Sequence, residues 1–345
     1  MKKIVFSCLE YERYQKKFGK SFEYNNFLLS LQKLPDTELI FVSFQKLIET
    51  SRQEFNRELL ECVKREKPDL FFAFMYTDEF DRTTLDEIRK HTKTLAWFSD
   101  DHWRFDNYSQ HYARHFDWVV TTHSKAPERY RKIGQPNVIR SQWFCNSDTY
   151  VPVTVEKDVD VSFLGLKNRG RASVISSLSK KGMDIYVSGN GWQRGKLNQQ
   201  EFITMFSRSK INLNINNTRA LWEPYAWGRL FARRSADAFV PSFDFVNNVR
   251  SWKNMLTPQI KARPFEIGAC GGFCISGWAD DIETYYEPDK EMVFYKDADD
   301  LAEKIQYYLA HDDERKNIAR AGYDRTLRDH TYTRRFEQIF KAIGL

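Results

Sequence analysis

Residues 259–273, QIKARPFEIGACGGF, place two cations and one carboxylate in an otherwise largely apolar segment. Pro264 fits the first turn of a helix, because its missing N–H is one that a helix start leaves unpaired. Such a helix start offers free N–H groups and the positive end of the helix dipole, which together accommodate phosphate groups. Lys261 and Arg263 add full positive charges at this point. The segment therefore predicts a diphosphate site at the start of a helix.

The carboxylate in this segment indicates what else the ligand carries. Glu266 would repel a diphosphate unless it faced a different group. A ribose offers two vicinal hydroxyls, from which a carboxylate can accept hydrogen bonds. Gly271 and Gly272 fall where the helix ends and the next strand begins. The combination predicts a nucleoside diphosphate with a sugar attached. The alternative is a solvated helix start in which Lys261, Arg263 and Glu266 form surface ion pairs.

A pair of adjacent carboxylates follows another apolar run. Asp100 and Asp101 come directly after TLAWF, so they should project from the carboxyl end of a strand, together with His102. A group-transfer enzyme needs a residue there that accepts the proton of an acceptor hydroxyl. We predict Asp100 or Asp101 rather than His102, because adjacent carboxylates raise one another's pKa. The alternative is a helix cap in which the carboxylates pair with Arg104.

Short apolar runs alternate with helical patterns along the whole chain, which is typical of βαβ units with buried parallel sheets. A polar stretch at 146–158 separates two such series. We therefore expect an α/β protein with domains at 1–150 and 158–325, and a C-terminal helix at 326–345 that could cross back to the first domain. Ligands of such sheets bind outside the carboxyl ends of the strands, so we expect a cleft between the domains.

The composition bounds the class of protein. The 345 residues are 41% hydrophobic, 29% charged and 15% aromatic, which is typical of a globular protein and excludes disorder. A net charge of +6, without a basic stripe or a recognised motif, argues against nucleic acid. Five cysteines without C-x-x-C pairs indicate reduced thiols. The apolar runs are too short for a signal peptide or a membrane span, so we expect a cytoplasmic protein that could contact the inner face of the membrane peripherally.

The segment QIKARPFEIGACGGFCIS and the helical tail from EPDKEMVFYKDADD onward resemble the nucleotide-sugar domain of GT-B glycosyltransferases. The resemblance is to the CgeB-like, or spore-maturation, branch of that fold and covers most of residues 160–340. It implies two Rossmann-like domains that face a central cleft, with the donor held by the C-terminal domain. Retaining relatives of family 4 carry a second acidic residue eight positions before the nucleotide-binding Glu, whereas this chain has Pro258 there. The stereochemical outcome therefore cannot be carried over. The donor-binding residues that the resemblance implies in this segment are Lys261, Arg263, Glu266, Gly271 and Gly272.

The same resemblance extends to the first strand and loop of the domain, VSFLGLKNRGRASVISSL. It implies that Gly165 lets the backbone approach the phosphates, and that Lys167, Arg169 or Arg171 caps them. In the loop SGNGW, Trp192 could stack on the base, although a core tryptophan in a plain turn would have the same sequence.

On the acceptor side, the resemblance points to the loop after the first strand. It implies that acceptor and sugar approach the backbone at Gly19, Lys20 and Ser21. Ser21 could instead cap the helix that follows. The family also has an acidic residue or a histidine at the strand end where Asp100 and Asp101 stand.

Other motifs favour structural explanations. His111 and His115 have the spacing of zinc ligands on a helix, but no third ligand is convincingly placed, so we interpret them as a solvated face. The D-x-D sequences at 158–160 and 297–299 open a strand and cap a helix. We therefore expect no metal and no cofactor. The aromatic and Arg-rich segment 218–257 fits no periodic pattern, and we interpret it as an insertion that either forms a lid over the cleft or contacts a lipid-linked acceptor at the membrane.

These observations predict a glycosyltransferase that moves a sugar from a nucleoside diphosphate donor to a hydroxyl acceptor, such as a glycan, a lipid-linked sugar or another surface polysaccharide precursor. A nucleotide-sugar epimerase of the same fold, or a non-catalytic protein that binds nucleotide sugars or glycans, would have many of the same features. The sequence leaves open the base and sugar of the donor, the acceptor and the oligomeric state.

Overall fold

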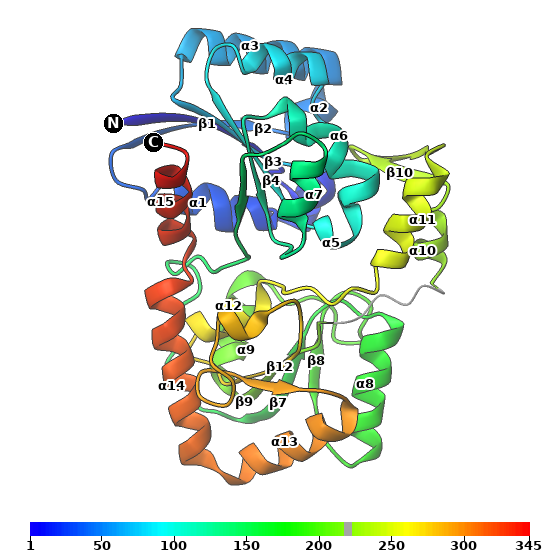
Figure 1. The fold of residues 1–345 in the computed structure, drawn as a ribbon. Coiled ribbons are helices and arrows are strands. Elements are labelled where there is room, and N and C mark those ends of the chain that lie inside the picture. Colours follow the sequence, from blue (N-terminus) through cyan, green and yellow to red (C-terminus); the bar gives the residue numbers. More distant parts are fainter. Residues whose placement is uncertain (217–222) are drawn as a thin grey trace. The chain divides into compact units, whose positions relative to one another are not determined.

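The computed structural model describes residues 1–216 and 223–345, so the first part of the predicted insertion, 218–222, lies outside the described residues. The chain divides into two compact units (Figure 1). The N-terminal unit contains Met1–Gln142, Pro224–Met255 and Tyr332–Leu345, and the C-terminal unit contains Trp143–Glu223 and Leu256–Thr331. The chain therefore enters the N-terminal unit three times.

The N-terminal unit is built on a parallel sheet with the strand order β2-β1-β3-β4-β5-β6. Its strands are β1 (Lys2–Cys8), β2 (Thr37–Ser43), β3 (Leu70–Phe74), β4 (Lys93–Phe98), β5 (Trp118–Thr121) and β6 (Val138–Arg140). The central strands are apolar on both faces because helices cover both: β3 reads LFFAF with every residue buried. In Figure 1, α3 and α4 lie on one face of this sheet, and α1 and α15 lie on the other.

In the segments Met1–Gln142 and Tyr332–Leu345 of this unit, the helices are short apart from α3 and α15. The α-helices are α1 (Leu29–Leu31), α2 (Gln45–Glu49), α3 (Arg52–Glu66), α4 (Arg82–Ile88), α5 (Asp101–Arg104), α6 (Gln110–Tyr112), α7 (Ala126–Lys132) and α15 (Tyr332–Ala342). Short segments of 3-10 or π helix are η1 (Glu12–Tyr14), η2 (Lys16–Phe18), η3 (Tyr24–Leu28), η4 (Phe105–Ser109) and η5 (Ala113–His115).

The last helix, α15, is held to the N-terminal unit by aromatic packing. The ring of Phe27 lies 4.7 Å from the ring of Tyr332 and 5.5 Å from that of Phe336. The ammonium group of Lys93 donates to the carbonyl oxygens of Ile343 and Gly344, at 3.1 and 2.9 Å. These contacts bury one face of α15 and satisfy carbonyl groups at the end of the chain.

Residues 224–255, the main part of the predicted insertion, belong to the N-terminal unit. They form α10 (Pro224–Gly228), the antiparallel hairpin of β10 (Ala232–Ser235) and β11 (Ala238–Pro241), and α11 (Phe245–Asn254). Helix α11 contacts α5 and η4.

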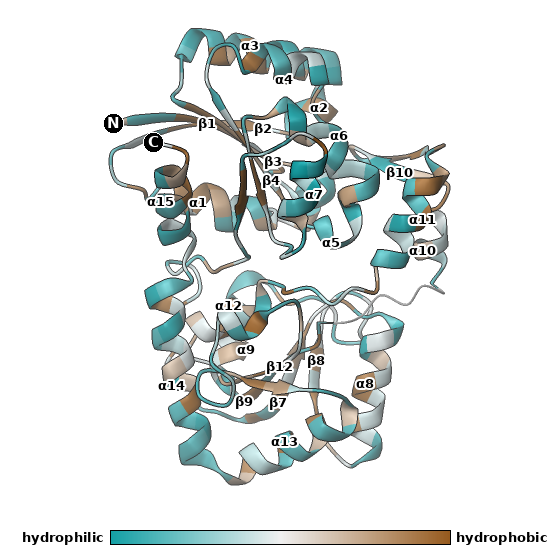
Figure 2. Cartoon of the chain, in the orientation of Figure 1, coloured by the Kyte–Doolittle hydropathy of each residue, from teal (hydrophilic) through white to brown (hydrophobic). Residues whose placement is uncertain are grey.

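The C-terminal unit has a parallel sheet with the strand order β13-β12-β9-β7-β8. Its strands are β7 (Val159–Leu164), β8 (Tyr186–Ser188), β9 (Ser209–Asn214), β12 (Cys274–Gly277) and β13 (Val293–Tyr295). Its helices are α8 (Arg169–Lys180), α9 (Gln199–Arg208), α12 (Arg263–Ala269), α13 (Ala298–Ala310), α14 (Asp312–Asp329) and the short η6 (Ile282–Thr284). In Figure 2 the strands of both sheets are mainly brown, because their side chains form the two cores.

The predicted α/β fold with two Rossmann-like units is confirmed. In both sheets the alternation of apolar runs and helical patterns corresponds to parallel strands joined through helices. The carboxyl ends of neighbouring strands therefore meet at one edge of each sheet, and the predicted chemical groups follow these strands.

Candidate donor and acceptor sites

The candidate donor site lies at the carboxyl edge of the C-terminal sheet. Gly165 follows β7, and Asn216 follows β9, the neighbouring strand. Helix α12 precedes β12, packs against β9 and β12, and runs in the opposite direction to them, so its first residue, Arg263, lies at this same edge. Two helix starts, those of α8 and α12, therefore point toward one edge of the sheet.

Two loops at this edge are joined backbone to backbone. The N–H of Gly165 donates to Ser188 O at 2.9 Å, and the indole N–H of Trp192 donates to Gly165 O at 2.9 Å. Gly189 has a φ of +139°, and a Cβ at this position would lie 2.1 Å from Gly165 O. Only glycine fits there. The half-buried Trp192 thus holds the loop at Gly165 in place.

Cationic side chains gather at the start of α8. Arg171 donates from Nε to Ile215 O at 3.2 Å and from Nη1 to Leu166 O at 3.0 Å, so it links the ends of β7 and β9. Lys167 and Arg169 are exposed beside it. The Asn168 side chain caps the helix by accepting from the N–H of Arg171 at 2.9 Å. The structure therefore brings Gly165, Lys167, Arg169 and Arg171 together around the positive end of a 12-residue helix.

Glu266 lies in the first turn of α12 and is only 4% exposed. Its Oε2 pairs with Nη1 of Arg263 at 2.5 Å, and the Arg263 guanidinium lies 4.1 Å from the centre of the Phe202 ring. The hydroxyl of Tyr150 also hydrogen-bonds to Glu266, and burial, followed by the charge of Glu266, raises the pKa of Tyr150. A carboxylate has about four acceptor positions. Two fixed partners therefore orient Glu266 and still leave it able to accept hydroxyl groups.

Of the remaining three residues predicted for the donor site, two glycines lie elsewhere. Gly271 and Gly272 follow the last turn of α12, about 10 Å along the helix from Arg263. Their positions have packing reasons: Gly271 has a φ of +66°, and a Cβ at Gly272 would lie 2.9 Å from Asn212 Nδ2 and from a methyl carbon of Ile267. The structure does not bring these glycines together with the cations of α8. Lys261, which precedes α12, is half-buried at the same end as Arg263.

In the N-terminal unit, the two candidate carboxylates at the end of β4 have different environments. Asp101 is 0% exposed, and its Oδ2 accepts from Thr121 Oγ1 at 2.6 Å and from the Tyr130 hydroxyl at 2.8 Å. Burial raises the pKa of Asp101, although hydrogen bonds from these hydroxyls and from Ser109 oppose the shift. Asp101 therefore links α5 to β5 and α7.

Asp100 is half-buried and precedes α5 without capping it. Arg104, the alternative partner for these carboxylates, donates instead to Tyr76 O at 2.7 Å and covers the ring of Tyr108 at 3.9 Å. His102 is buried, and its ring centre lies 4.1 Å from that of His123. Of the three predicted residues, Asp100 is thus the most accessible.

The loop after β1 places two of its three predicted residues in internal contacts. Ser21 donates to Leu9 O and accepts from the N–H of Tyr24 at 3.0 Å, so it caps a helical turn. Lys20 pairs with Glu10 at 2.7 Å and lies 3.9 Å from the centre of the Tyr24 ring. Gly19 adopts a φ of +82°, and a Cβ at this position would meet no atom outside the adjoining residues within 4 Å.

Sequence reasoning missed Glu23, which is 9% exposed. Burial raises the pKa of Glu23 to about 8, and the negative charges of Glu12 and Asp100 add to the shift. The carboxyl group of Glu23 therefore lies within electrostatic range of Asp100 at the carboxyl edge of the N-terminal sheet. The signal in the sequence was a carboxylate two residues after Ser21, at the start of a helical pattern that follows a buried strand.

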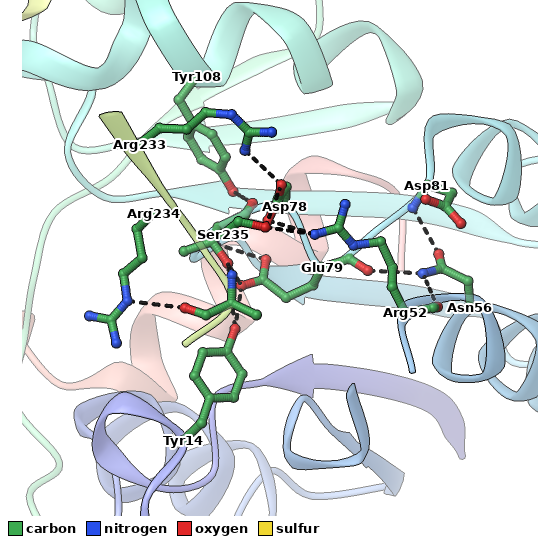
Figure 3. Close-up of polar contacts among 12 residues, drawn as sticks. Tyr14, Arg52, Asn56, Asp78, Glu79, Asp81, Tyr108, Arg233, Arg234 and Ser235 are labelled. Atoms are coloured by element: carbon green, nitrogen blue, oxygen red, sulfur yellow. Dashed lines mark hydrogen bonds and ion pairs between the residues drawn. The ribbon is translucent and has the colours of Figure 1, made fainter. Parts of the chain in front are cut away.

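A second group that sequence reasoning missed is a buried network around Asp78 and Glu79, after the end of β3 (Figure 3). Glu79 Oε1 accepts from the Tyr14 hydroxyl at 2.7 Å. Asp78 pairs with Arg52 at 3.0 Å and with Arg233 at 2.6 Å. Burial alone would raise the pKa of Asp78, but hydrogen bonds from Arg233 and Ser235 and the charge of Arg52 lower it below its ordinary value.

The two histidines and the two D-x-D sequences that we interpreted as structural form contacts within the protein. Each histidine lies near a different aspartate. His115 Nδ1 lies 2.8 Å from Asp86, and His111 Nε2 lies 3.7 Å from Asp244. In the D-x-D at 158–160, both carboxylates form ion pairs with cations of β9 and the preceding helix. In the other D-x-D, Asp297 caps α13.

Comparison with known proteins finds similarity to glycosyltransferases. The family model described as glycosyl transferase-like matches residues 171–341, just under half of the chain. No curated protein matches the sequence.

Solved structures match the fold over the whole chain. A sucrose-phosphate synthase from Thermosynechococcus elongatus superposes with a TM-score of 0.65 at 10% identity, covering 100% of this chain and 99% of its own. A glycosyltransferase from Rickettsia africae gives 0.62 at 12% identity, covering 99% and 98%. HepE from Anabaena, solved with UDP-glucose, gives 0.62 at 10% identity and covers 100% of both chains. The chain has the GT-B fold, and the family match within its C-terminal half supports a GT-B glycosyltransferase.

Within the described ranges 1–216 and 223–345, no helix combines the length and the apolar character needed to span a bilayer.

Proposed function

We propose that this protein transfers a sugar, of the hexose type, from a nucleoside diphosphate donor to a hydroxyl acceptor. The observation that carries the proposal is the arrangement at the carboxyl edge of the C-terminal sheet. There the oriented carboxylate of Glu266 and the cations at the start of α8 lie around the ends of β7 and β9. This pairing of one acceptor group with several cations matches a ribose joined to a diphosphate.

Each donor-site residue has a role in this proposal. Glu266 accepts the ribose hydroxyls, and Arg263 and Tyr150 hold its carboxylate in place. Lys167, Arg169 and Arg171, together with Lys261 and the loop at Gly165, bind the diphosphate and stabilise the charge that develops on it as the sugar leaves. HepE was solved with UDP-glucose, so uridine diphosphate is the first probe to use.

The N-terminal unit supplies the acceptor side. Asp100 accepts the proton of the acceptor hydroxyl. The oxygen of that hydroxyl bonds to the anomeric carbon of the donor sugar while the bond from this carbon to the diphosphate breaks. Glu23 lies within electrostatic range of Asp100. Because its raised pKa keeps the Glu23 carboxyl group neutral near pH 7, Glu23 adds no second negative charge near Asp100. We expect no divalent cation to be required, since cationic side chains supply the charge at the donor site. The acceptor is a glycan or a lipid-linked sugar, and the motifs around Glu266 favour the CgeB-like branch.

A panel of nucleotide sugars incubated with candidate acceptors tests this function. We expect slow release of nucleoside diphosphate from one donor without acceptor, faster release with an acceptor, and no loss of rate on addition of EDTA. A donor recovered with an altered sugar would instead show an epimerase. Binding without release of nucleotide under any condition would show a non-catalytic sugar-nucleotide protein, and either result would reject the proposal.

A further inference from the structure

The segment of the N-terminal unit from α10 to α11 exposes an unusual number of large apolar side chains. Among the described residues, seventeen such side chains are exposed, and eight of them lie within the 32 residues Pro224–Met255. Phe243 is 82% exposed, Phe239 67% and Val246 65%. We call the eight residues the aromatic surface; they are Tyr225, Trp227, Phe231, Phe239, Phe243, Phe245, Val246 and Val249.

Helix α11 is arranged with its polar side inward. It buries Asn248 and Ser251, and it exposes Phe245, Val246 and Val249. The inward side is satisfied because Asn248 Nδ2 donates to Leu230 O at 3.1 Å and to Ser242 Oγ at 2.9 Å. A surface helix in water normally turns its apolar side to the core. The outward side of α11 is therefore built for a surrounding less polar than water.

Polar contacts of the β10–β11 hairpin hold the aromatic surface on the N-terminal unit. Arg233 and Ser235, on one face of the β10–β11 hairpin, bind Asp78 at 2.6 and 3.0 Å (Figure 3). The N–H of Ala236 donates to Thr77 Oγ1 at 3.1 Å. Phe239 pairs with Arg234 across the hairpin, so these two side chains share one face. Arg233 and Ser235 lie on the opposite face. Opening this segment as a lid would break a buried charge network, which is strongly unfavourable.

The charge of the segment indicates what covers the aromatic surface. Pro224–Met255 contains five cations (Arg229, Arg233, Arg234, Arg250 and Lys253), of which Arg233 pairs with Asp78, and two carboxylates (Asp237 and Asp244), so 4 − 2 leaves +2. Arg250 and Lys253 are exposed on α11 among its apolar residues. A second copy of this chain would bring like charges together. A bilayer with anionic lipids instead offers phosphates for the cations and an apolar layer for the rings.

We propose that the aromatic surface docks the protein on the face of an anionic membrane. Phe239, Phe243 and Val246 enter the headgroup layer, and Arg250 and Lys253 bind lipid phosphates. The inference goes beyond the proposed function and does not depend on it, because it concerns a separate segment of the chain. It places the enzyme where a lipid-linked acceptor would be found.

Sedimentation with lipid vesicles tests the proposal on the full chain. We expect the protein to bind vesicles that contain phosphatidylglycerol much more tightly than vesicles of phosphatidylcholine alone. The double variant Phe239→Ser/Phe243→Ser should bind at least roughly tenfold more weakly, because two exposed rings no longer enter the bilayer. Arg250→Glu/Lys253→Glu should remove the preference for the anionic lipid. Leu327→Ser, an exposed residue on α14, is the matched control and should bind as the unaltered protein does.

Because the altered side chains are exposed, the variants should keep their circular dichroism spectra and their affinity for nucleotide. Equal binding by the Phe239→Ser/Phe243→Ser variant and the unaltered protein would overturn the proposal. So would an absence of vesicle binding, or a dimer in solution that this variant dissociates. Vesicle binding without any transferase activity would leave this inference standing while the proposed function failed.

Discussion

Asp100→Asn should lower kcat by about 10²- to 10⁴-fold and leave the affinity for the donor unchanged, because it removes the group that accepts the proton of the acceptor hydroxyl. The substitution keeps the size of the side chain, and Asp100 is only half-buried, so the fold should tolerate it. Initial rates at saturating donor and acceptor measure kcat, and calorimetric titration with nucleoside diphosphate measures binding.

Asp101→Asn is the matched control, because it makes the same chemical change one position away. Asp101 accepts from two buried hydroxyls, so its replacement should cost on the order of 1–3 kcal/mol of folding free energy. The protein that remains folded should keep turnover within a few-fold of the original. The reverse pattern, with Asp100→Asn active and a stably folded Asp101→Asn inactive, would move the catalytic role to Asp101.

Glu23→Gln should stabilise the N-terminal unit by an amount that increases with pH. The folded state raises the pKa of Glu23 from 4.5 to about 8, so below pH 4.5 the carboxyl group is neutral in both states and costs nothing. Between these values the unfolded chain releases the proton while the folded chain keeps it, and the stability of the unaltered protein falls. Above pH 8 the full difference, roughly 3 to 5 kcal/mol, should favour the Glu23→Gln variant.

Urea unfolding at pH 5, 7 and 9 measures this difference. Glu87→Gln is a control of opposite sign: a hydrogen bond from Lys90 lowers the pKa of Glu87, so its contribution is present above its ordinary pKa and lost in acid. That variant should be the less stable protein at pH 7, and its deficit should shrink as the pH falls. A Glu23→Gln effect that does not change with pH would show that Glu23 does not titrate as the structure indicates.

The sheets and the carboxyl-edge groups could be predicted from the sequence because both depend on local patterns. A run such as LFFAF at 70–74 fits a strand buried on both faces, and residues that follow such strands meet at one edge. Gly165, Arg171 and Glu266 were predicted as donor-site residues in this way or through the family resemblance, and these roles stay predictions. Asp100 was predicted from its strand end, although only the structure shows how its surroundings differ from those of Asp101.

The rest depends on contacts between distant segments, which no local pattern records. Arg233 binds Asp78, 155 positions earlier, and this contact helps to hold residues 224–255 on the N-terminal unit. The pKa of Glu23 is raised because the fold buries its carboxyl group and brings it within electrostatic range of Asp100. Gly271 and Gly272 follow Glu266 closely in sequence, yet the length of α12 separates them from its first turn.

The central claim is that a nucleoside diphosphate binds at the carboxyl edge of the C-terminal sheet, with its ribose held by Glu266. Calorimetric titration with uridine, guanosine, cytidine and thymidine diphosphates tests it most directly when the unaltered protein is compared with Glu266→Ala and with Asp100→Asn. We predict that one nucleotide binds and that Glu266→Ala raises its Kd roughly ten- to a hundredfold, because charge-assisted hydrogen bonds to the ribose are lost. Asp100→Asn should leave this Kd unchanged. A folded Glu266→Ala protein with the original Kd, or an unaltered protein that binds none of the four nucleotides, would contradict the account.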